Sequence, residues 1–264
     1  MILHNFDPIL IDFGIIQIRW YSLAYIFGIL IGWWYGKIIL VRQVSQSQSV
    51  YLSKFDDLIG YIIIGIIVGG RLGYVFVYNP AFYFDNILEI FKIWKGGMSF
   101  HGGLIGVALG AYIFSKKNNL NYKIYFDTIS AVAPIGIFLG RISNFINSEL
   151  YGSPTQKAWG VIFPNIDSLP RHPSQIYEAL LEGIFLFLIL NMLIFFRKNF
   201  NGFISIVFLV LYSFFRIICE QFREPDNHIG YIFNYFSMGS ILSIVMMLFG
   251  FFLLLKFMND EKNK

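Results

Sequence analysis

The sequence predicts an all-α membrane protein with seven transmembrane helices, an N-terminus outside and a C-terminus in the cytoplasm. Of the 264 residues, 56% are hydrophobic, 19% aromatic and only 14% charged, and the mean hydropathy is +0.62. A soluble domain usually carries about 25% charged residues. Several apolar runs reach the ~20 residues that cross a bilayer. A soluble protein with an unusually large core does not explain runs of that length.

Seven apolar segments are expected to form the spans. In chain order they cover roughly residues 20–40, 58–78, 101–115, 125–146, 175–196, 202–222 and 236–257. The third segment is short and begins with glycines, which indicates burial among the other helices. No segment has the composition of a separate soluble domain, so residues 1–264 are interpreted as a single integral-membrane domain.

The two longest connections, residues 79–100 and 147–174, are rich in Pro, Gly, Asn and aromatic residues. They are interpreted as short loop or arm segments on the outer side of the membrane. For residues 147–174 this composition is typical both of a moving arm and of a packed cap. The sequence leaves these two alternatives open.

The distribution of Lys and Arg between the loops indicates the orientation. One side holds eleven of them: Lys37, Arg42, Lys54, Lys116, Lys117, Lys123, Arg197, Lys198, Lys256, Lys262 and Lys264. The other side holds six: Arg19, Lys92, Lys95, Lys157, Arg171 and Arg223. Because cytoplasmic loops carry the excess of positive charge, the first side is expected in the cytoplasm. The net charge of +4 therefore reflects membrane orientation, and no nucleic-acid partner is expected.

Three of the expected spans carry a glycine at every fourth position. The triplets are Gly28, Gly32 and Gly36, then Gly65, Gly69 and Gly73, then Gly102, Gly106 and Gly110. Each triplet makes a smooth helix face that lets another backbone come close. The pattern favours close helix packing and says little about chemistry.

Polar and charged residues gather at the outer ends of the expected spans. A charged side chain at mid-bilayer costs from about 2.5 to well over 10 kcal/mol, so such residues need a reason. The set comprises Tyr21, Arg71, His101, Arg141, Asn144, Asn147, Glu149, Ser174, Gln175, Tyr177, Glu178, Glu182, Tyr212, Arg216, Glu220 and Arg223. Tyr212, Arg216 and Glu220 follow at four-residue intervals and are expected on one side of a helix.

Arginine is expected to outnumber glutamate among the inward-facing residues. The residues counted are Arg71, Arg141, Arg216 and Arg223 against Glu149 and Glu220. A surplus of buried guanidinium groups indicates an anion site, and the planar fork of arginine fits phosphate oxygens. The sequence therefore predicts a phosphate-binding site. The alternative is that the charges only pair between helices, as Arg216 and Glu220 are spaced to do.

Other kinds of chemistry lack the residues that they need. The sequence has no paired-aspartate helix pattern, no H-E-x-x-H, no Gly-rich phosphate loop and no G-x-S-x-G elbow. Neither a metal nor a cofactor is therefore expected. Cys219, the single cysteine, lies in an apolar segment and is interpreted as a packing residue. His101 precedes two glycines and is either an interfacial hydrogen bonder or a proton carrier near neutral pH.

The segment from Gly140 to Gly152 resembles the signature of the prolipoprotein diacylglyceryl transferases, G-R-x-x-N-F-x-N-x-E-x-x-G. Other segments are similar to the family in the same order: Arg19-Trp20-Tyr21, His101-Gly102-Gly103-Leu104, Arg171 through Glu178, Arg216 through Glu220, and Phe222 through Asp226. The similarity covers nearly the whole chain. Ser143 and Ser148 depart from it, since many members have glycine there.

The resemblance implies a transferase of the bacterial inner membrane whose active site faces the periplasm. Such enzymes move the diacylglyceryl group of phosphatidylglycerol onto the lipobox cysteine of a prolipoprotein signal peptide, an early step of lipoprotein biosynthesis. A thioether forms and glycerol phosphate leaves. The chain is expected to be a monomer among membrane lipids. By similarity, the lipid-binding residues are Arg141, Asn144, Asn147, Glu149, Gly152, Tyr212 and Arg223, and the catalytic ones are His101, Arg141, Arg216, Glu220 and Tyr21.

The implied reaction needs a base and a positive field. A free cysteine has a pKa of about 8.5, and the thiolate is the nucleophile. His101 is the first candidate for taking the thiol proton, and Glu220 and the substrate phosphate are the alternatives. Arg141 and Arg216 are expected to oppose the charge on the departing phosphate.

Two other classes of protein share some of these features. A transporter or flippase for an anionic lipid could hold its cargo with the same arginines. Such proteins often show inverted repeats and polar groups near mid-membrane, whereas this sequence has no clear internal repeat and its polar groups gather at one end. A membrane scaffold would not need three buried arginines.

Overall fold

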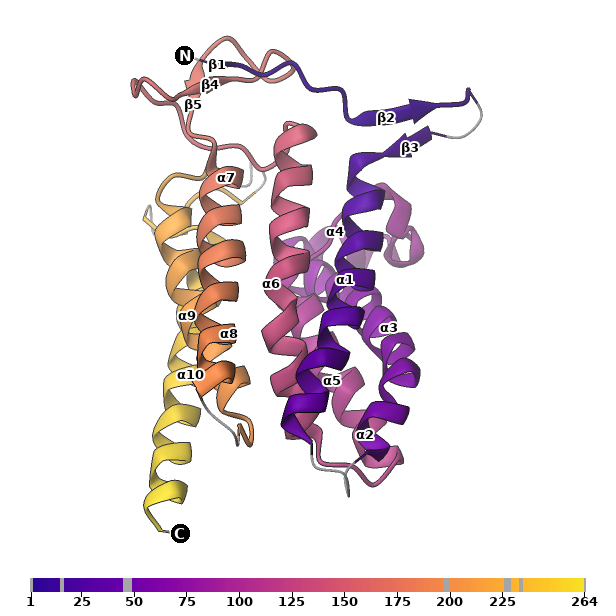
Figure 1. The fold of residues 1–264 in the computed structure, drawn as a ribbon. Helices are drawn as coiled ribbons and strands as arrows, with labels where there is room; N and C mark the ends of the chain where they lie inside the picture. The colour runs from indigo at the N-terminus through magenta and orange to yellow at the C-terminus, as the bar shows by residue number, and fades with distance from the viewer. Residues whose placement is uncertain are drawn as a thin grey trace. The chain divides into compact units, whose positions relative to one another are not determined.

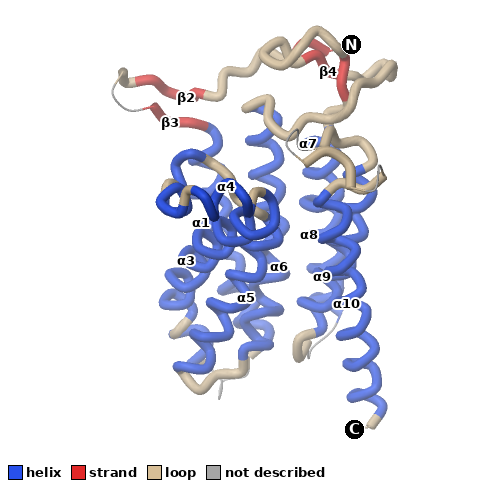
Figure 2. Tube along the Cα trace, turned by 180° about the vertical axis from the view of Figure 1, so that it is seen from behind, coloured by secondary structure: helices blue, strands red, loops and turns tan. Residues whose placement is uncertain are grey.

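The structure is a computed structural model that describes residues 2–14, 17–44, 49–196, 200–225, 229–232 and 235–263. Arg197, Lys198 and Lys264 of the charge count, and Asp226 of the family-like segments, lie outside the described residues. Helix makes up most of the traced chain, and the strands are short (Figures 1 and 2). Contacts group the chain into two compact units, Met1–Gly36 with Ile129–Lys264, and Lys37–Thr128.

Two long helices, α1 (Trp20–Gln43) and α6 (Tyr122–Ile146), have residues in both units. The rest of the first unit contains α7 (Ser174–Glu178), the π-helical segment η5 (Ala179–Phe185), α8 (Leu186–Phe196), α9 (Phe203–Glu220) and α10 (Met238–Lys262). Segments α7, η5 and α8 follow one another without a break as one span. Helices α9 and α10 lie side by side (Figure 1).

The second unit is helical in all its described secondary structure. Its elements are α2 (Val50–Ser53), α3 (Phe55–Gly73), the π-helical η2 (Tyr74–Tyr78), α4 (Pro80–Asp85), the 3₁₀ segments η3 (Ile87–Phe91) and η4 (Ile93–Lys95), and α5 (Phe100–Lys117). Helices α3 and α5 pack against each other along most of their length.

Within the described part of the chain, six helices are long and apolar enough to cross a membrane: Trp20–Gln43, Phe55–Tyr78, Tyr122–Ile146, Ser174–Phe196, Phe203–Glu220 and Met238–Lys262. The chain is therefore a multi-pass, mostly helical membrane protein, as predicted. The third expected span is also a helix, α5, but it is not among these six described candidates. A seventh crossing and the orientation stay predictions.

Two small β-sheets in the first unit were not expected from the sequence. Strand β1 (Ile2–Leu3) pairs in parallel with β4 (Val161–Ile162), and β4 pairs antiparallel with β5 (Pro170–Arg171). Strands β2 (Ile9–Asp12) and β3 (Gln17–Arg19) form an antiparallel pair before α1. Strands of two to four residues are too short to show a period-2 pattern in the sequence.

The glycine faces of α3 and α5 contact each other. A Cβ added to Gly65 would lie 2.4 Å from the carbonyl oxygen of Gly106, and one on Gly69 would lie 2.4 Å from that of Gly102. A Cβ on Gly73 would lie 2.6 Å from the Cα of Gly102. No side chain fits at these distances, so glycine is what allows the two backbones to touch. The predicted helix packing is confirmed here.

The connection 147–174 is hydrogen-bonded to neighbouring segments of the first unit. Gly152 N donates to the carbonyl oxygen of His172 at 3.0 Å, and Ser153 N donates to that of Phe222 at 2.9 Å. A Cβ on Gly152 would lie 2.3 Å and 2.6 Å from the same two oxygens, so the position requires glycine. Of the two alternatives for this connection, the packed cap fits these contacts.

Candidate functional site

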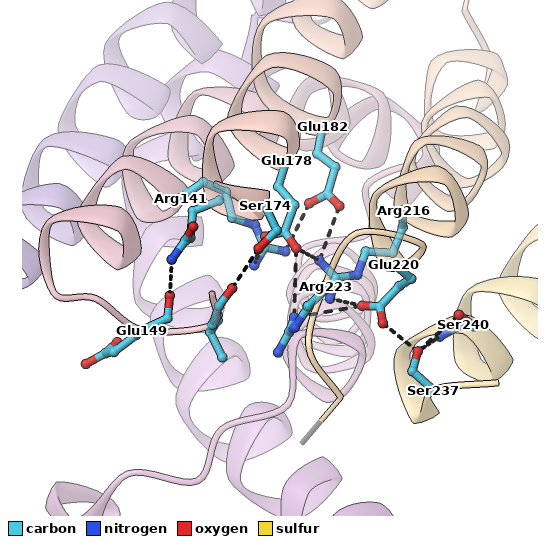
Figure 3. Close-up of polar contacts among 12 residues, drawn as sticks. Arg141, Glu149, Ser174, Glu178, Glu182, Arg216, Glu220, Arg223, Ser237 and Ser240 are labelled. Carbon is cyan, nitrogen blue, oxygen red and sulfur yellow. Dashed lines mark hydrogen bonds and ion pairs between the residues drawn. The ribbon is translucent and has the colours of Figure 1, made fainter. Parts of the chain in front are cut away.

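Three arginines and three glutamates meet in the first unit (Figure 3). We call them the arginine–glutamate cluster: Arg141 on α6, Glu178 on α7, Glu182 on η5, Arg216 and Glu220 on α9, and Arg223 just after α9. All six side chains are at most 11% exposed, and those of Glu178 and Glu182 are fully buried. Charges so far from water require close partners.

Helical spacing brings the members together. Arg216 and Glu220 are four residues apart on α9, and Tyr212 lies one turn earlier. All three are buried, which confirms that they share one side of the helix. Glu178 and Glu182 are also four residues apart, at the junction of α7 with the π-helical η5. Single π-helical turns within α-helices often occur at functional sites.

Two arginines and two glutamates form a closed set of four ion pairs. Arg141 Nη1 lies 2.8 Å from Oε2 of Glu178, and Arg141 Nη2 lies 2.9 Å from Oε2 of Glu182. Arg216 Nη1 lies 2.8 Å from Oε1 of Glu178 and 3.3 Å from Oε1 of Glu182. Each carboxylate thus bridges both guanidinium groups, one oxygen to each.

Glu220 extends this set toward α10. Its Oε1 accepts a hydrogen bond from Nη2 of Arg216, and its Oε2 accepts one from the hydroxyl of Ser237 at 2.5 Å. Ser237 caps α10 by accepting from the backbone N of Ser240 at 3.0 Å. Arg223 Nη1 lies 3.8 Å from Glu220 Oε1. The start of α10 is therefore linked to the cluster.

The predicted surplus of inward-facing arginine is wrong. The sequence predicts Glu178 and Glu182 at the start of their span and only Glu149 and Glu220 as inward-facing, whereas Glu178 and Glu182 both point into the cluster. The cluster contains three arginines and three glutamates, so its formal charge is zero. Pairing between helices, the alternative interpretation, describes these contacts correctly. An excess of positive charge cannot be the argument for an anion site here.

Arg71 has a structural role, so it does not belong among the arginines that are available to an anion. Its guanidinium donates to the carbonyl oxygens of Glu89, Ile90, Lys92, Gly96 and Gly97, at 2.5 to 3.3 Å. A guanidinium has five N–H groups, and five backbone carbonyls surround this one. Arg71 holds residues 89–97 in place in the second unit, so no donor is left for an anion.

Arg141 differs from Arg71 because donors remain. Among the described residues, its polar contacts are a hydrogen bond from Nη2 to Glu182 and an ion pair between Nη1 and Glu178, so at most two of its five N–H groups are engaged. Asn144 lies one helical turn further along α6 and is 9% exposed. Its side-chain amide has no hydrogen bond to another described residue. An arginine and an amide with unused donors on adjacent turns can together bind phosphate oxygens.

Three more residues expected to bind lipid, Asn147, Glu149 and Gly152, follow the end of α6. Asn147 Nδ2 donates to Oε1 of Glu149 at 3.4 Å. The backbone oxygen of Glu149 accepts from Gln175 at 2.6 Å, while its carboxylate points away from the cluster (Figure 3). Gly152 takes part in the backbone packing of the connection 147–174.

Tyr21 and Tyr212 occupy different environments in the first unit. Tyr21 is 36% exposed at the start of α1, and its hydroxyl lies 3.1 Å from that of Tyr25. Tyr212 is fully buried on α9, and its ring stacks on Phe208 at 5.7 Å between centroids.

His101 belongs to the second unit, where it is the second residue of α5. The helix is capped by Ser99, whose hydroxyl accepts from the backbone N of Gly102 at 3.2 Å. The imidazole is half-buried and contacts the ring of Phe100 edge-on, at 5.8 Å between centroids. Its expected role in proton transfer stays a prediction.

Arg171 anchors the loop that precedes α7. Its guanidinium donates to Asp167 at 2.5 Å and to the carbonyl oxygen of Gly152 at 3.1 Å, and it covers the ring of Tyr151. Hydrogen bonds from Arg171 lower the pKa of the Asp167 carboxyl below its usual range. This arginine, like Arg71, stabilises local structure. No group of three or more His, Cys, Asp or Glu placed to hold a metal occurs among the described residues.

Comparison with known proteins gives consistent matches over nearly the whole chain. The sequence model of the prolipoprotein diacylglyceryl transferase family matches residues 8–256. A phosphatidylglycerol–prolipoprotein diacylglyceryl transferase of Rickettsia typhi is 50% identical over 256 residues, covering 96% of this chain and 98% of the relative. Those of Rickettsia bellii and Rickettsia felis are 51% and 49% identical, over 96% and 95% of this chain and 95% and 96% of their own.

Proposed function

Because the chain belongs to the prolipoprotein diacylglyceryl transferase family, we propose that it transfers the diacylglyceryl group of phosphatidylglycerol to a prolipoprotein. The acceptor is the thiol of the lipobox cysteine, the product is a thioether, and glycerol phosphate is released. The match over residues 8–256, with half of the residues identical to the Rickettsia typhi relative, is the observation that carries this function.

The proposed setting is the bacterial inner membrane, crossed seven times by one monomeric domain. The seventh crossing is α5. Its start lies against Gly73 of α3, and a Cβ on Gly110 would lie 2.6 Å from the backbone oxygen of Tyr61, so α5 runs back along α3. Its 18 residues extend about 27 Å at 1.5 Å per residue. The excess of Lys and Arg on the other side supports a position of the cluster toward the periplasm.

In the proposed reaction the cysteine thiolate attacks the glyceryl carbon that is bonded to a phosphate oxygen. The C–S bond forms as the C–O bond breaks, and the electron pair of the C–O bond leaves with the phosphate of glycerol. Negative charge therefore grows on the phosphate oxygens. Arg141 and Arg216 are the groups that oppose this charge, and such opposition is strongest where water is excluded.

Arg141 and Asn144 are the proposed primary ligands of the lipid phosphate. Both have unused donors on adjacent turns of α6, which supports this assignment. Asn147, Glu149, Gly152, Tyr212 and Arg223 are proposed to shape the rest of the headgroup site, with Tyr21 at the start of α1. Binding of the phosphate by separate donors on one rigid helix fixes its orientation before the reaction.

His101 is the proposed acceptor of the thiol proton. Glu220, its rival, already accepts hydrogen bonds on both oxygens, from Arg216 and Ser237. Because both oxygens already accept hydrogen bonds, Glu220 is a weaker candidate for the base. His101→Gln is expected to lose most activity at every pH, whereas near-normal turnover across the pH range would assign the proton to another group.

The direct test is a transfer assay with purified protein in phosphatidylglycerol-containing nanodiscs and a synthetic lipobox peptide. We expect the peptide cysteine to gain the mass of a diacylglyceryl group. Arg141→Gln should abolish the gain while the protein remains folded and inserted, and Lys157→Gln, an exposed cation in the same unit, should retain it. A lipid transporter or a scaffold would give no mass gain with the wild-type chain.

A further inference from the structure

Glu178 and Glu182 have no part in the proposed reaction, yet they are among the most deeply buried charged residues described. Neither side chain has measurable exposure. Each gives one carboxylate oxygen to Arg141 and the other to Arg216, at 2.8 to 3.3 Å. Arg141 of α6 and Arg216 of α9 are thus linked by the same two carboxylates.

The four ion pairs constrain the direction of both guanidinium groups. An arginine side chain has many rotamers and loses orientation when it lacks partners. Arg141 has its two Nη atoms on Glu178 and Glu182, so its remaining N–H groups point in fixed directions. Arg216 donates from Nη1 to both Glu178 and Glu182, and from Nη2 to Glu220. Preorganised donors stabilise a transition state better than donors that must reorient.

Glu178 and Glu182 also determine the net charge around the bound phosphate. The phosphodiester of the lipid carries one negative charge, whereas the released phosphate monoester carries about 1.5 to 2 near neutral pH. A cluster of three unbalanced arginines would hold the more negative product more strongly than the substrate. With Glu178, Glu182 and Glu220 present, the formal charge is zero. Balanced charge favours release of the product.

We propose that Glu178 and Glu182 are positioning residues, which aim Arg141 and Arg216 at the lipid phosphate and keep the cluster neutral so that glycerol phosphate can leave. This inference rests on the proposed function. It assigns a task to two residues that were not expected to act in the site. It also explains why a buried anion site contains as many carboxylates as guanidinium groups.

The test compares steady-state kinetics of Glu178→Gln and Glu182→Gln with the wild type in the nanodisc assay. Turnover is expected to fall roughly 10- to 100-fold, since the arginines lose one of their shared partners. Inhibition by added glycerol phosphate is expected to tighten about tenfold because one negative charge is gone. The KM for phosphatidylglycerol should stay equal or fall. A merely structural role would lower the amount of active enzyme and leave the inhibition constant for glycerol phosphate unchanged.

Two further variants serve as controls for the charge and the location of the carboxylate. Glu182→Asp keeps the charge but shortens the reach, so it should lower turnover without tightening product inhibition. Asp167→Asn removes a carboxylate from the Arg171 pair outside the cluster and should leave both parameters near wild type.

The outcomes separate this inference from the proposed function. Absence of transfer by the wild-type chain would refute the function itself. Transfer by the wild type, with unchanged turnover and inhibition in both glutamine variants, would overturn only the positioning role. Failure of both variants to insert into the membrane would also overturn it, because the pair would then serve folding.

Discussion

Arg141 Nη2 donates to Oε2 of Glu182 at 2.9 Å and so ties the last turns of α6 to the π-helical segment η5. Nη1 of the same guanidinium meets Glu178 at 2.8 Å. A lysine ammonium is a single point charge and cannot replace both nitrogens. The two-nitrogen geometry of the Arg141 guanidinium, and not only its charge, therefore links α6 to α7 and η5.

We expect Arg141→Lys to lower diacylglyceryl transfer by about 100-fold or more, although the charge is retained. The ammonium cannot reach Glu178, Glu182 and a lipid phosphate together. Mass gain on a lipobox peptide, followed over time, measures the effect. Arg42→Lys, an exposed position on α1, is the matched control and should behave as wild type. Turnover within about threefold of wild type in Arg141→Lys would show that charge alone suffices.

A second prediction concerns stability in the other unit. Arg71→Lys should destabilise the protein by about 2–4 kcal/mol, because several of the five carbonyls around the guanidinium lose their donor. The midpoint of thermal unfolding in detergent is the measurement. Lys92→Gln is the control, since its ion pair with Glu89 is partly exposed and exposed ion pairs contribute little to stability. An unchanged midpoint for Arg71→Lys would contradict the proposed anchoring of residues 89–97.

The sequence could predict the helices and their glycine contacts, because both depend on local patterns. Apolar runs of membrane-spanning length locate the spans, and glycine at every fourth position locates the face that α3 turns toward α5. The charge balance of the site does not follow from such patterns. Whether Glu182 faces inward depends on the π-helical geometry of η5, which shifts side chains relative to an α-helix.

The partners of Arg71 were also beyond the reach of sequence analysis. They are backbone carbonyls of residues 89–97. Because every residue has a backbone carbonyl, no residue type marks them in the sequence. A signal for Glu178 and Glu182 was nevertheless present, since two carboxylates one turn apart in an apolar span must have partners. Counting them with the arginines would have predicted a neutral cluster.

A third prediction tests the contact between α3 and α5. Gly69→Ala should destabilise the protein strongly, by about 3 kcal/mol or more, since a Cβ would lie 2.4 Å from a backbone oxygen. Gly60→Ala on the same helix is the matched control, because nothing lies within 4 Å of its added Cβ. We expect that change to be neutral or stabilising by up to about 1 kcal/mol. Equal unfolding midpoints for the two variants would refute close packing at Gly69.

A fourth prediction concerns two buried serines. The hydroxyl of Ser143 on α6 has no hydrogen-bond partner among the described residues, whereas that of Ser213 on α9 donates to Leu209 O at 2.7 Å. Ser143→Ala should therefore stabilise the protein by about 0.5–1 kcal/mol, since alanine favours helix and leaves no unsatisfied group. Ser213→Ala should destabilise it. A lower unfolding midpoint for Ser143→Ala, or an unchanged or higher one for Ser213→Ala, would contradict this assignment.

The last prediction is a pH dependence at the N-terminal segment. His4 Nε2 donates to the carbonyl oxygen of Phe145 at 2.8 Å, and its Nδ1 lies 3.3 Å from the hydroxyl of Ser148. Phe6, Phe145 and Phe163 surround the imidazole, with ring centroids at 5.0 to 5.3 Å. Burial lowers the pKa of His4 below its ordinary value of 6.5. Docking therefore favours the neutral form of the His4 imidazole.

The released segment binds a proton more readily than the docked one, because its histidine has the ordinary pKa. Docking is thus most stable above about pH 6.5 and weakens as the pH falls below that value. Hydrogen-exchange protection of the His4 amide, which donates to Ile162 O, should decrease between about pH 7.5 and about pH 5.5. His4→Phe fills the aromatic site without titrating and should remove the dependence. Equal loss of protection in the wild type and in His4→Phe would show that another group controls docking.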